Sequence, residues 1–166
     1  MKSTVFRKII IATDGSELVK RAVDFAIEIA NLAEAKLYAV HVVALGSDLL
    51  IPSRDKEWKR TIEEQLTIEG KKATAFVENA GRAVSVEVES IILKGNPANE
   101  ILDFAERNDI DLIVMGTHGK TGIQRFFIGS VSENVVRHSK RAVLVVRGES
   151  SDLLFQAMLQ SKEQTQ

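Results

Sequence analysis

Short apolar runs alternate along the chain with longer amphipathic segments, and this alternation restricts the fold more than any other feature of the sequence. Each apolar run has the length of a strand, and a segment long enough for a helix follows most of them. Alternation of this kind is typical of strand-helix-strand units, which place their strands parallel in one sheet. The predicted strands lie at residues 5–12, 36–43, 83–93, 110–115 and 141–147.

The predicted strands differ in how much of their surface can meet water. Residues 36–43 and 110–115 are apolar on both faces, which favours central positions. In residues 83–93 valines alternate with polar residues, so one face meets water and the strand belongs at an edge. We therefore predict an α/β fold with a doubly wound five-stranded parallel sheet, order 3-2-1-4-5, and helices on both faces. Ligands of such sheets bind outside the carboxyl ends of the strands where the order reverses, here between strands 1 and 4.

The first two helices are predicted from apolar periodicity and from residues typical of helix ends. Ser16 is expected to cap the first helix. A longer helix is predicted over about residues 54–80, with Trp58 and Phe76 among its inward-facing side chains. Gly81 is predicted to end that helix as a left-handed cap.

The last two helices have clear start signals. Asn96 is expected to cap the third helix, with Pro97 at its first position, where the missing N–H costs nothing. Ser130 and Glu133 have the spacing of a capping box for a short helix that ends near His138.

The composition fits one domain without a nucleic-acid or membrane partner. The 166 residues match a domain of ordinary size, which we place at residues 1–147, before a C-terminal tail at 148–166 that is expected to be partly helical or disordered. A formal net charge of -1 gives no overall attraction to nucleic acid or anionic membranes. There is no cysteine and no apolar run near the roughly 20 residues needed to cross a bilayer. The apolar run from Ile9 to Ala12 is too short for the hydrophobic region of a signal peptide, so none is expected. We expect a cytoplasmic protein.

Glycines concentrate after the fourth predicted strand, in Gly116-Thr117-His118-Gly119, nine further residues, and Gly129-Ser130. Glycine allows a backbone to approach a ligand closely, so that amide groups can converge on an anion. Gly129-Ser130 also lies at a predicted helix start, where unpaired N–H groups and the helix dipole favour phosphate. On spacing alone, a strand exit, a surface turn and an ordinary helix cap explain the same residues.

The same stretch, with its Gly-x-x-Gly, nine residues and Gly-Ser, resembles the ATP-binding signature of the universal stress protein family. The opening from Ile10 to Ser16 and the segment Val40-His41-Val42 resemble that family too, and the likeness covers about residues 4–147. The resemblance implies a nucleotide-dependent regulatory or stress-response protein that binds ATP, with Mg²⁺ or Mn²⁺ accompanying the nucleotide.

The resemblance also implies which residues would surround an adenine nucleotide. They follow three of the predicted strands or begin the last helix: Ala12, Thr13, Asp14, Val42, Met115, Gly116, His118, Gly119, Gly129, Ser130, Val131 and Ser132. The first three would border the adenosine, Val42 would bond adenine through its backbone, the next four would line the ribose and phosphate path, and the last four would hold phosphates. Asp14 could also ligate the metal ion, or it could be a turn residue that bonds the first amides of the following helix.

Several functions stay open on the sequence alone. No general base is evident beside the glycine-rich segment, so the chain is expected to be at most a slow ATPase. An ATP-using enzyme of the related nucleotide-binding α/β group would carry a motif such as His-x-Gly-His, which is absent. A phosphoacceptor receiver domain would need an acidic pair after the first strand, where Asp14 is followed by Gly15. An interaction module with a vestigial pocket is a further alternative.

The last predicted strand points to a second copy of the chain as a partner. Ala142 to Val146 are apolar on both faces, yet the predicted order puts them at a sheet edge, where an uncovered strand invites pairing. A two-fold contact is self-complementary, so a second copy is the simplest cover. The family resemblance also implies a homodimer through this strand. The apolar tail residues Leu153 to Leu159 are the rival cover.

Overall fold

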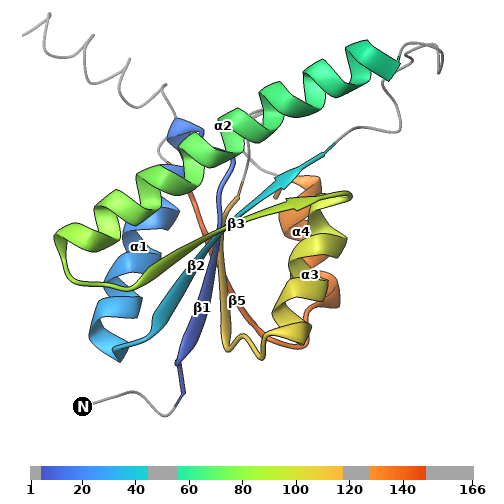
Figure 1. The fold of residues 1–166 in the computed structure, drawn as a ribbon. Coiled ribbons are helices and arrows are strands. Elements are labelled where there is room, and N and C mark those ends of the chain that lie inside the picture. The colour runs from blue at the N-terminus through green and yellow to red at the C-terminus, as the bar shows by residue number, and fades with distance from the viewer. Residues whose placement is uncertain (1–4, 45–55, 118–127, 149–166) are drawn as a thin grey trace, which may run out of the picture.

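The computed structural model describes residues 5–44, 56–117 and 128–148. Strands and helices alternate through these residues, as Figure 1 shows. In chain order the elements are β1 (Lys8–Ala12), α1 (Glu17–Ala33), β2 (Lys36–Val43), α2 (Lys56–Ala83), β3 (Val88–Lys94), α3 (Pro97–Arg107), β4 (Leu112–Gly116), α4 (Ser130–His138) and β5 (Ala142–Val146).

The strands form one sheet in the order β3-β2-β1-β4-β5, and every neighbouring pair is parallel. The predicted topology is therefore confirmed. At the centre, Ile10 of β1 is in register with Tyr38 of β2 on one side and with Ile113 of β4 on the other. Because β1 and β4 pair in parallel, their carboxyl ends lie next to each other, and the helices that come next after them, α1 and α4, pack on opposite faces of the sheet.

Helices cover both faces of the sheet, as predicted, and the alternation of side chains along each strand creates two cores. Ile9 and Ile11 of β1 point to one face, where they pack with residues of α1 and α2. Ile10 points to the other face and packs with residues of α3 and α4. All three side chains are fully buried. The central strands are thus enclosed on both sides, which explains their nearly continuous apolar sequence.

The predicted end of α2 at Gly81 is wrong, because the helix continues to Ala83. Gly81 is buried inside the helix, and a Cβ built there would lie 2.3 Å from Cγ2 of Val88 on β3. This glycine therefore lets α2 pack closely on the edge strand instead of turning the chain. The chain turns later, at Ser85, whose φ is 61°. β3 accordingly begins at Val88 and not at residue 83, although it is an edge strand as predicted.

The prediction that Trp58 and Phe76 face the core is also wrong, since they are 41% and 46% exposed. α2 has 28 residues and β3 has 7. At 1.5 Å per helical residue and about 3.3 Å per strand residue, the helix is therefore about 42 Å long and the strand about 23 Å. The first turns of α2 consequently extend past the sheet (Figure 1). Phe76 lies beside α1, with Nζ of Lys20 5.6 Å from its ring centroid.

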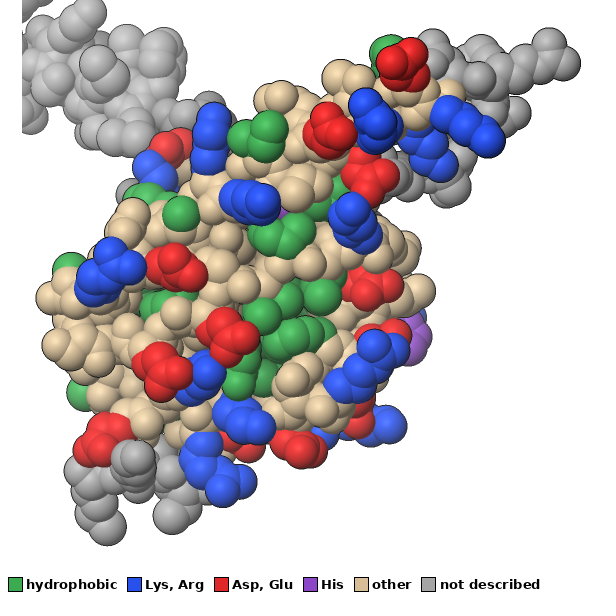
Figure 2. Space-filling model, in the orientation of Figure 1, with side chains coloured by type: hydrophobic (Ala, Val, Ile, Leu, Met, Phe, Trp, Pro, Cys, Tyr) green, Lys and Arg blue, Asp and Glu red, His purple; other side chains and the backbone are tan. Residues whose placement is uncertain are grey.

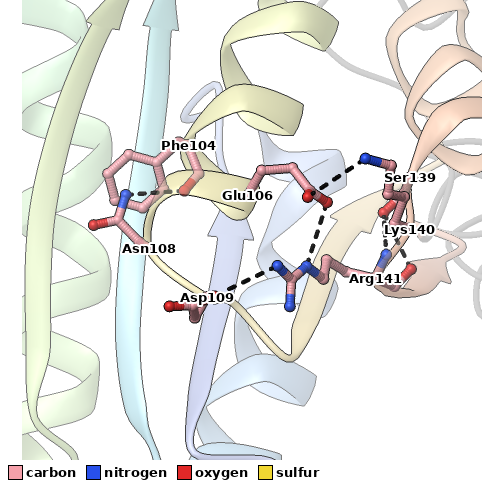
Figure 3. Close-up of polar contacts among 7 residues, drawn as sticks. All are labelled: Phe104, Glu106, Asn108, Asp109, Ser139, Lys140 and Arg141. Carbon is pink, nitrogen blue, oxygen red and sulfur yellow. Dashed lines mark hydrogen bonds and ion pairs between the residues drawn. The ribbon is translucent and has the colours of Figure 1, made fainter.

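A polar network holds the amino end of β5 to the end of α3 (Figure 3). The Arg141 guanidinium lies 3.4 Å from a Glu106 carboxylate oxygen and 3.7 Å from one of Asp109. Lys140 lies 3.7 Å from Glu106 as well. Ser139 closes the turn, because its Oγ donates to the Arg141 carbonyl at 3.1 Å. The network lies at the opposite end of the sheet from the carboxyl ends of the strands.

Candidate functional site

A cavity of about 210 Å³ opens where β1, β2 and β4 end and where α3 and α4 begin. Of the twelve site residues predicted from the sequence, His118 and Gly119 lie outside the described residues. The other ten all line this cavity: Ala12, Thr13, Asp14, Val42, Met115, Gly116, Gly129, Ser130, Val131 and Ser132. The structure thus brings together residues from three strand ends and one helix start, and their roles toward a nucleotide stay predictions.

The turn after β1 is shaped by its own side chains. The Thr13 amide donates to the Val40 carbonyl of β2 at 2.9 Å, and Thr13 Oγ1 accepts from the Gly15 amide at 3.2 Å. Asp14 Oδ1 accepts from the Ser16 amide at 2.9 Å, just before α1. Gly15 has a φ of 74°, which glycine adopts without steric cost. This turn places the Asp14 carboxylate at the cavity wall.

Asp14 suits a magnesium ion that accompanies a polyphosphate. Mg²⁺ in nucleotide sites is commonly bound by one or two carboxylates together with phosphate oxygens and water. Asp14 is half-buried on the cavity wall, and its Oδ1 is engaged by the Ser16 amide. Asp14 is the one carboxylate among the described wall residues, and a single carboxylate fits an ion carried in with its phosphates better than a resident metal. Within the residues that the structure describes, no group of three or more His, Asp or Glu side chains is placed to hold a metal.

The start of α4 presents backbone amides to the cavity. Gly129 is the N-cap residue and makes no side-chain cap, so the predicted capping box of Ser130 with Glu133 is wrong. The Glu133 carboxylate instead accepts from Arg137 at 2.7 Å, one helical turn later. The first bond of the helix joins the Glu133 amide to the Gly129 carbonyl at 2.9 Å. The preceding amides of the first turn therefore have no partner within the helix, and they carry the positive end of its dipole.

Two polar side chains in the cavity wall are nearly buried, and each bonds a carbonyl at the end of a strand. Ser132 is 4% exposed, and its Oγ donates to the Gly116 carbonyl at 2.7 Å. His41 is 8% exposed, and its Nδ1 lies 2.9 Å from the Thr13 carbonyl oxygen. Since a carbonyl can only accept, this contact requires the proton on Nδ1. Both bonds lock strand ends in place beside the cavity.

Much of the remaining wall is apolar, and the sequence prediction missed five wall residues, four of them apolar. The residues that it did not select as site residues are Val19, Val40, His41, Pro97 and Ile101. Pro97 and Ile101 belong to α3, which follows the edge strand β3 and not the strands at the reversal point. The topology could have predicted them, because every helix that follows a parallel strand begins at the same end of the sheet, where the site was expected. With Val42 and Met115, these residues provide an apolar slot beside the amides of α4.

A larger cavity, of about 430 Å³, lies at the opposite end of the sheet between the ends of α1 and α2. Its wall includes Glu34 and Glu87 as well as Arg7 and Lys36. Lys36 pairs with Glu89 and Glu87, and these two carboxylates raise the pKa of Lys36 above its usual range. The carbonyl ends of two helices meet here, so the local dipoles disfavour an anion. The smaller cavity is the better candidate site.

None of the helices in the described parts of the chain is both long enough and apolar enough to span a bilayer.

Comparisons with known proteins agree with the motif. The model of the universal stress protein family matches residues 6–147. Universal stress protein MJ0531 of Methanocaldococcus jannaschii is 41% identical over 143 residues, which are 86% of this chain and 83% of that protein. The structure of hypothetical protein MJ0577 has a TM-score of 0.75 and 30% identity, and the match covers 89% of this chain and all of that one.

Two similar structures contain nucleotides. One is the universal stress protein from Archaeoglobus fulgidus in complex with dAMP, with a TM-score of 0.65, 25% identity and coverage of 87% of this chain and 100% of that chain. The other is a universal stress protein in complex with cAMP, with a TM-score of 0.64, 25% identity and coverage of 88% and 100%. The matched family model spans every described element, and the relatives are similar over most of their length. The chain belongs to the universal stress protein family.

Proposed function

We propose that this protein binds an adenine nucleotide, foremost ATP with Mg²⁺, in the cavity at the carboxyl ends of the strands, and that it acts as a nucleotide-dependent regulatory or stress-response protein. One observation carries the proposal: the uncapped first turn of α4 and an apolar slot lie in the same cavity. The slot suits a base, and the amides suit phosphate. The dAMP and cAMP complexes of similar proteins support an adenine ligand.

The size of the cavity fits this arrangement. Its 210 Å³ is below the roughly 300 Å³ at which whole small-molecule sites begin. A nucleotide would therefore bury its base and ribose and leave its phosphates at the rim, against Gly129 and Ser130. Asp14 would hold the metal ion, which would neutralise phosphate charge when bound. Among the described residues of the wall Asp14 is the sole carboxylate, and its Oδ1 is engaged by the Ser16 amide, so turnover should be slow.

Calorimetry with ATP and Mg²⁺ on protein freed of nucleotide tests the proposal, with Gly129→Val as the comparison. Gly129 has a φ of -62° and a ψ of 155°, which any residue can adopt, so valine should leave the fold intact. Its side chain should block the phosphates and lower the ATP affinity at least about tenfold, or 1.4 kcal/mol. Equal affinities would refute the assignment of this phosphate site. A parent protein that binds no adenine nucleotide would favour an interaction module with a vestigial pocket.

A further inference from the structure

Ser132 uses its hydroxyl proton inside the protein. It is the third residue of α4, and its Oγ donates to the carbonyl of Gly116, the last residue of β4, at 2.7 Å. A serine hydroxyl has one proton to donate. While this bond exists, the hydroxyl cannot also donate to a phosphate. The backbone amide of Ser132 belongs to the first turn and stays available, because the helix bonds begin at Glu133.

A second bond joins the same two elements. The Gly129 amide donates to the Thr117 carbonyl at 2.7 Å, just after β4. One bond therefore lies before the first residue of α4, and the Ser132 bond lies at its third. The amides of Ser130 and Val131 are located between these two anchors. Their direction relative to the end of β4 is thus fixed from both sides.

The Ser132 bond also occupies an oxygen that would oppose an anion. Gly116 and Ser132 both line the cavity, and both are buried. Without the hydroxyl, the Gly116 carbonyl would be left at the wall of the cavity without its donor, and its partial negative charge would face any phosphate bound there. A buried acceptor that loses its donor destabilises its surroundings.

We propose that Ser132 is a positioning residue of the phosphate site, whose hydroxyl aligns the first turn of α4 and occupies the Gly116 carbonyl without contacting phosphate. The inference rests on the proposed function, because phosphate is the ligand that it concerns. Ser132 differs in this respect from Ser130, which is exposed at the first position of the same helix and whose hydroxyl is free to reach a ligand.

The first experiment compares Ser132→Ala with the matched variant Ser130→Ala in nucleotide-free protein. Hydrogen exchange of the Gly129 and Glu133 amides is followed by NMR, because both amides form bonds at the junction of β4 and α4. We expect these amides to exchange at least about tenfold faster in Ser132→Ala, as local opening becomes easier, and within about twofold of the parent in Ser130→Ala. The proposed alignment of α4 by the Ser132 hydroxyl exists before any nucleotide binds, so it must be visible in nucleotide-free protein. Unchanged exchange in Ser132→Ala therefore overturns the proposal.

The second experiment measures the affinities of parent and Ser132→Ala for adenosine, AMP, ADP and ATP. Relative to the parent, Ser132→Ala should lose less than about twofold in affinity for adenosine and about tenfold for ATP. A tenfold loss is the size expected when a buried acceptor loses its donor. An equal loss for adenosine and ATP would assign Ser132 a general structural role and overturn the proposal. Ser132→Thr keeps the hydroxyl and should restore both exchange and affinity.

If Ser132→Ala does not fold, Ser132→Cys takes its place. Its thiol has the same shape as the hydroxyl, is somewhat larger and is a weak donor, so both effects should go in the same direction and be smaller. A parent that binds none of the four ligands refutes the proposed function. Unchanged exchange in Ser132→Ala, in a parent that binds nucleotide, refutes the role of Ser132 alone, so the two failures are distinguishable.

Discussion

Gly70 is a point of very close approach between α2 and the sheet. A Cβ built there would lie 2.4 Å from Cδ2 of His41. The ring cannot move aside easily, because it is buried and its Nδ1 is bonded to the Thr13 carbonyl. Alanine in place of an interior helical glycine usually stabilises by about 1 kcal/mol, but forcing an extra carbon into a packed core costs about 1–3 kcal/mol. We expect Gly70→Ala to lower the free energy of unfolding by about 1 kcal/mol in urea titrations.

The double variant Gly70→Ala with His41→Ala identifies the obstacle. Removing the ring vacates the space that the new methyl group needs, so the double variant should be no less stable than His41→Ala alone. If Gly70→Ala stabilises the otherwise unchanged protein, the contact between helix and ring is looser than this structure has it.

The positions of the candidate site residues were easier to predict from the sequence than the roles of residues that matter for packing. Gly129 and Ser130 stand in a motif, and they line the cavity together with Gly116 of the same motif. Gly70 and Gly81 lie within an ordinary amphipathic helix, and each is required by a side chain on a strand that the helix packs against, His41 of β2 and Val88 of β3. A glycine in a helical pattern looks the same whether it is tolerated or needed. Its role becomes visible when the neighbouring strand is in place.

Two helices begin at polar caps that should differ in strength. The Asn96 side chain accepts from the Asn99 amide at 3.1 Å, whereas Ser16 makes no side-chain cap. Within the described residues the buried Ser16 hydroxyl has no hydrogen-bond partner. Replacing a bonded cap by alanine costs about 1 kcal/mol. We therefore expect Asn96→Ala to lower the unfolding free energy by that amount, and Ser16→Ala to change it by less than about 0.5 kcal/mol.

Chemical denaturation of both variants in the same buffer checks this difference. If Ser16→Ala proves as costly as Asn96→Ala, the Ser16 hydroxyl must have a partner that the described residues do not contain, for example an ordered water.

Helices and strands were predicted with their ends displaced, and the causes are physical. The apolar stripe of α2 continues past the sheet, so its periodicity gave no sign that Trp58 would be exposed. Phe76 lies beside α1, because a flank of α2 can meet a neighbouring helix as well as the sheet. The spacing of Ser130 and Glu133 matched a capping box, yet the helix begins one residue earlier than that motif requires. Local patterns do not reveal which neighbour an element meets.

At the scale of the molecule, the apolar patterns agreed with the strand order without fixing it alone. The apolar strands β2 and β4 are central and the polar alternation before and within β3 marks an edge, whereas β5 is an edge strand although its sequence is apolar on both faces. The order in turn located the candidate site at the reversal between β1 and β4. The contribution of α3 to that site was not predicted, because Pro97 was interpreted as a helix start and nothing more.

The two edges of the sheet differ in their protection. At β3, Lys36 forms ion pairs with Glu87 and Glu89 at 3.1 and 2.8 Å, and Lys94 pairs with Glu63 of α2. Figure 2 shows charged side chains surrounding the hydrophobic ones on the face where β3 lies. Charges of this kind discourage pairing with another strand. At β5 the exposed or half-buried residues from Ala142 to Val145 carry no charge.

We therefore predict a homodimer that forms through β5, because an apolar edge without charges is the part of the sheet that most readily pairs with a second copy. Val145→Asp would bring two carboxylates to a self-complementary contact and should weaken the dimer at least about tenfold.

Ile92→Asp is the matched control, a half-buried position on the other edge strand, and it should leave the dimer intact. Deletion of residues 150–166 should leave it intact as well. Sedimentation velocity over a concentration series, with unfolding curves to confirm that each variant is folded, distinguishes the outcomes: a monomeric parent refutes the dimer, and a monomeric truncated chain assigns the interface to the tail.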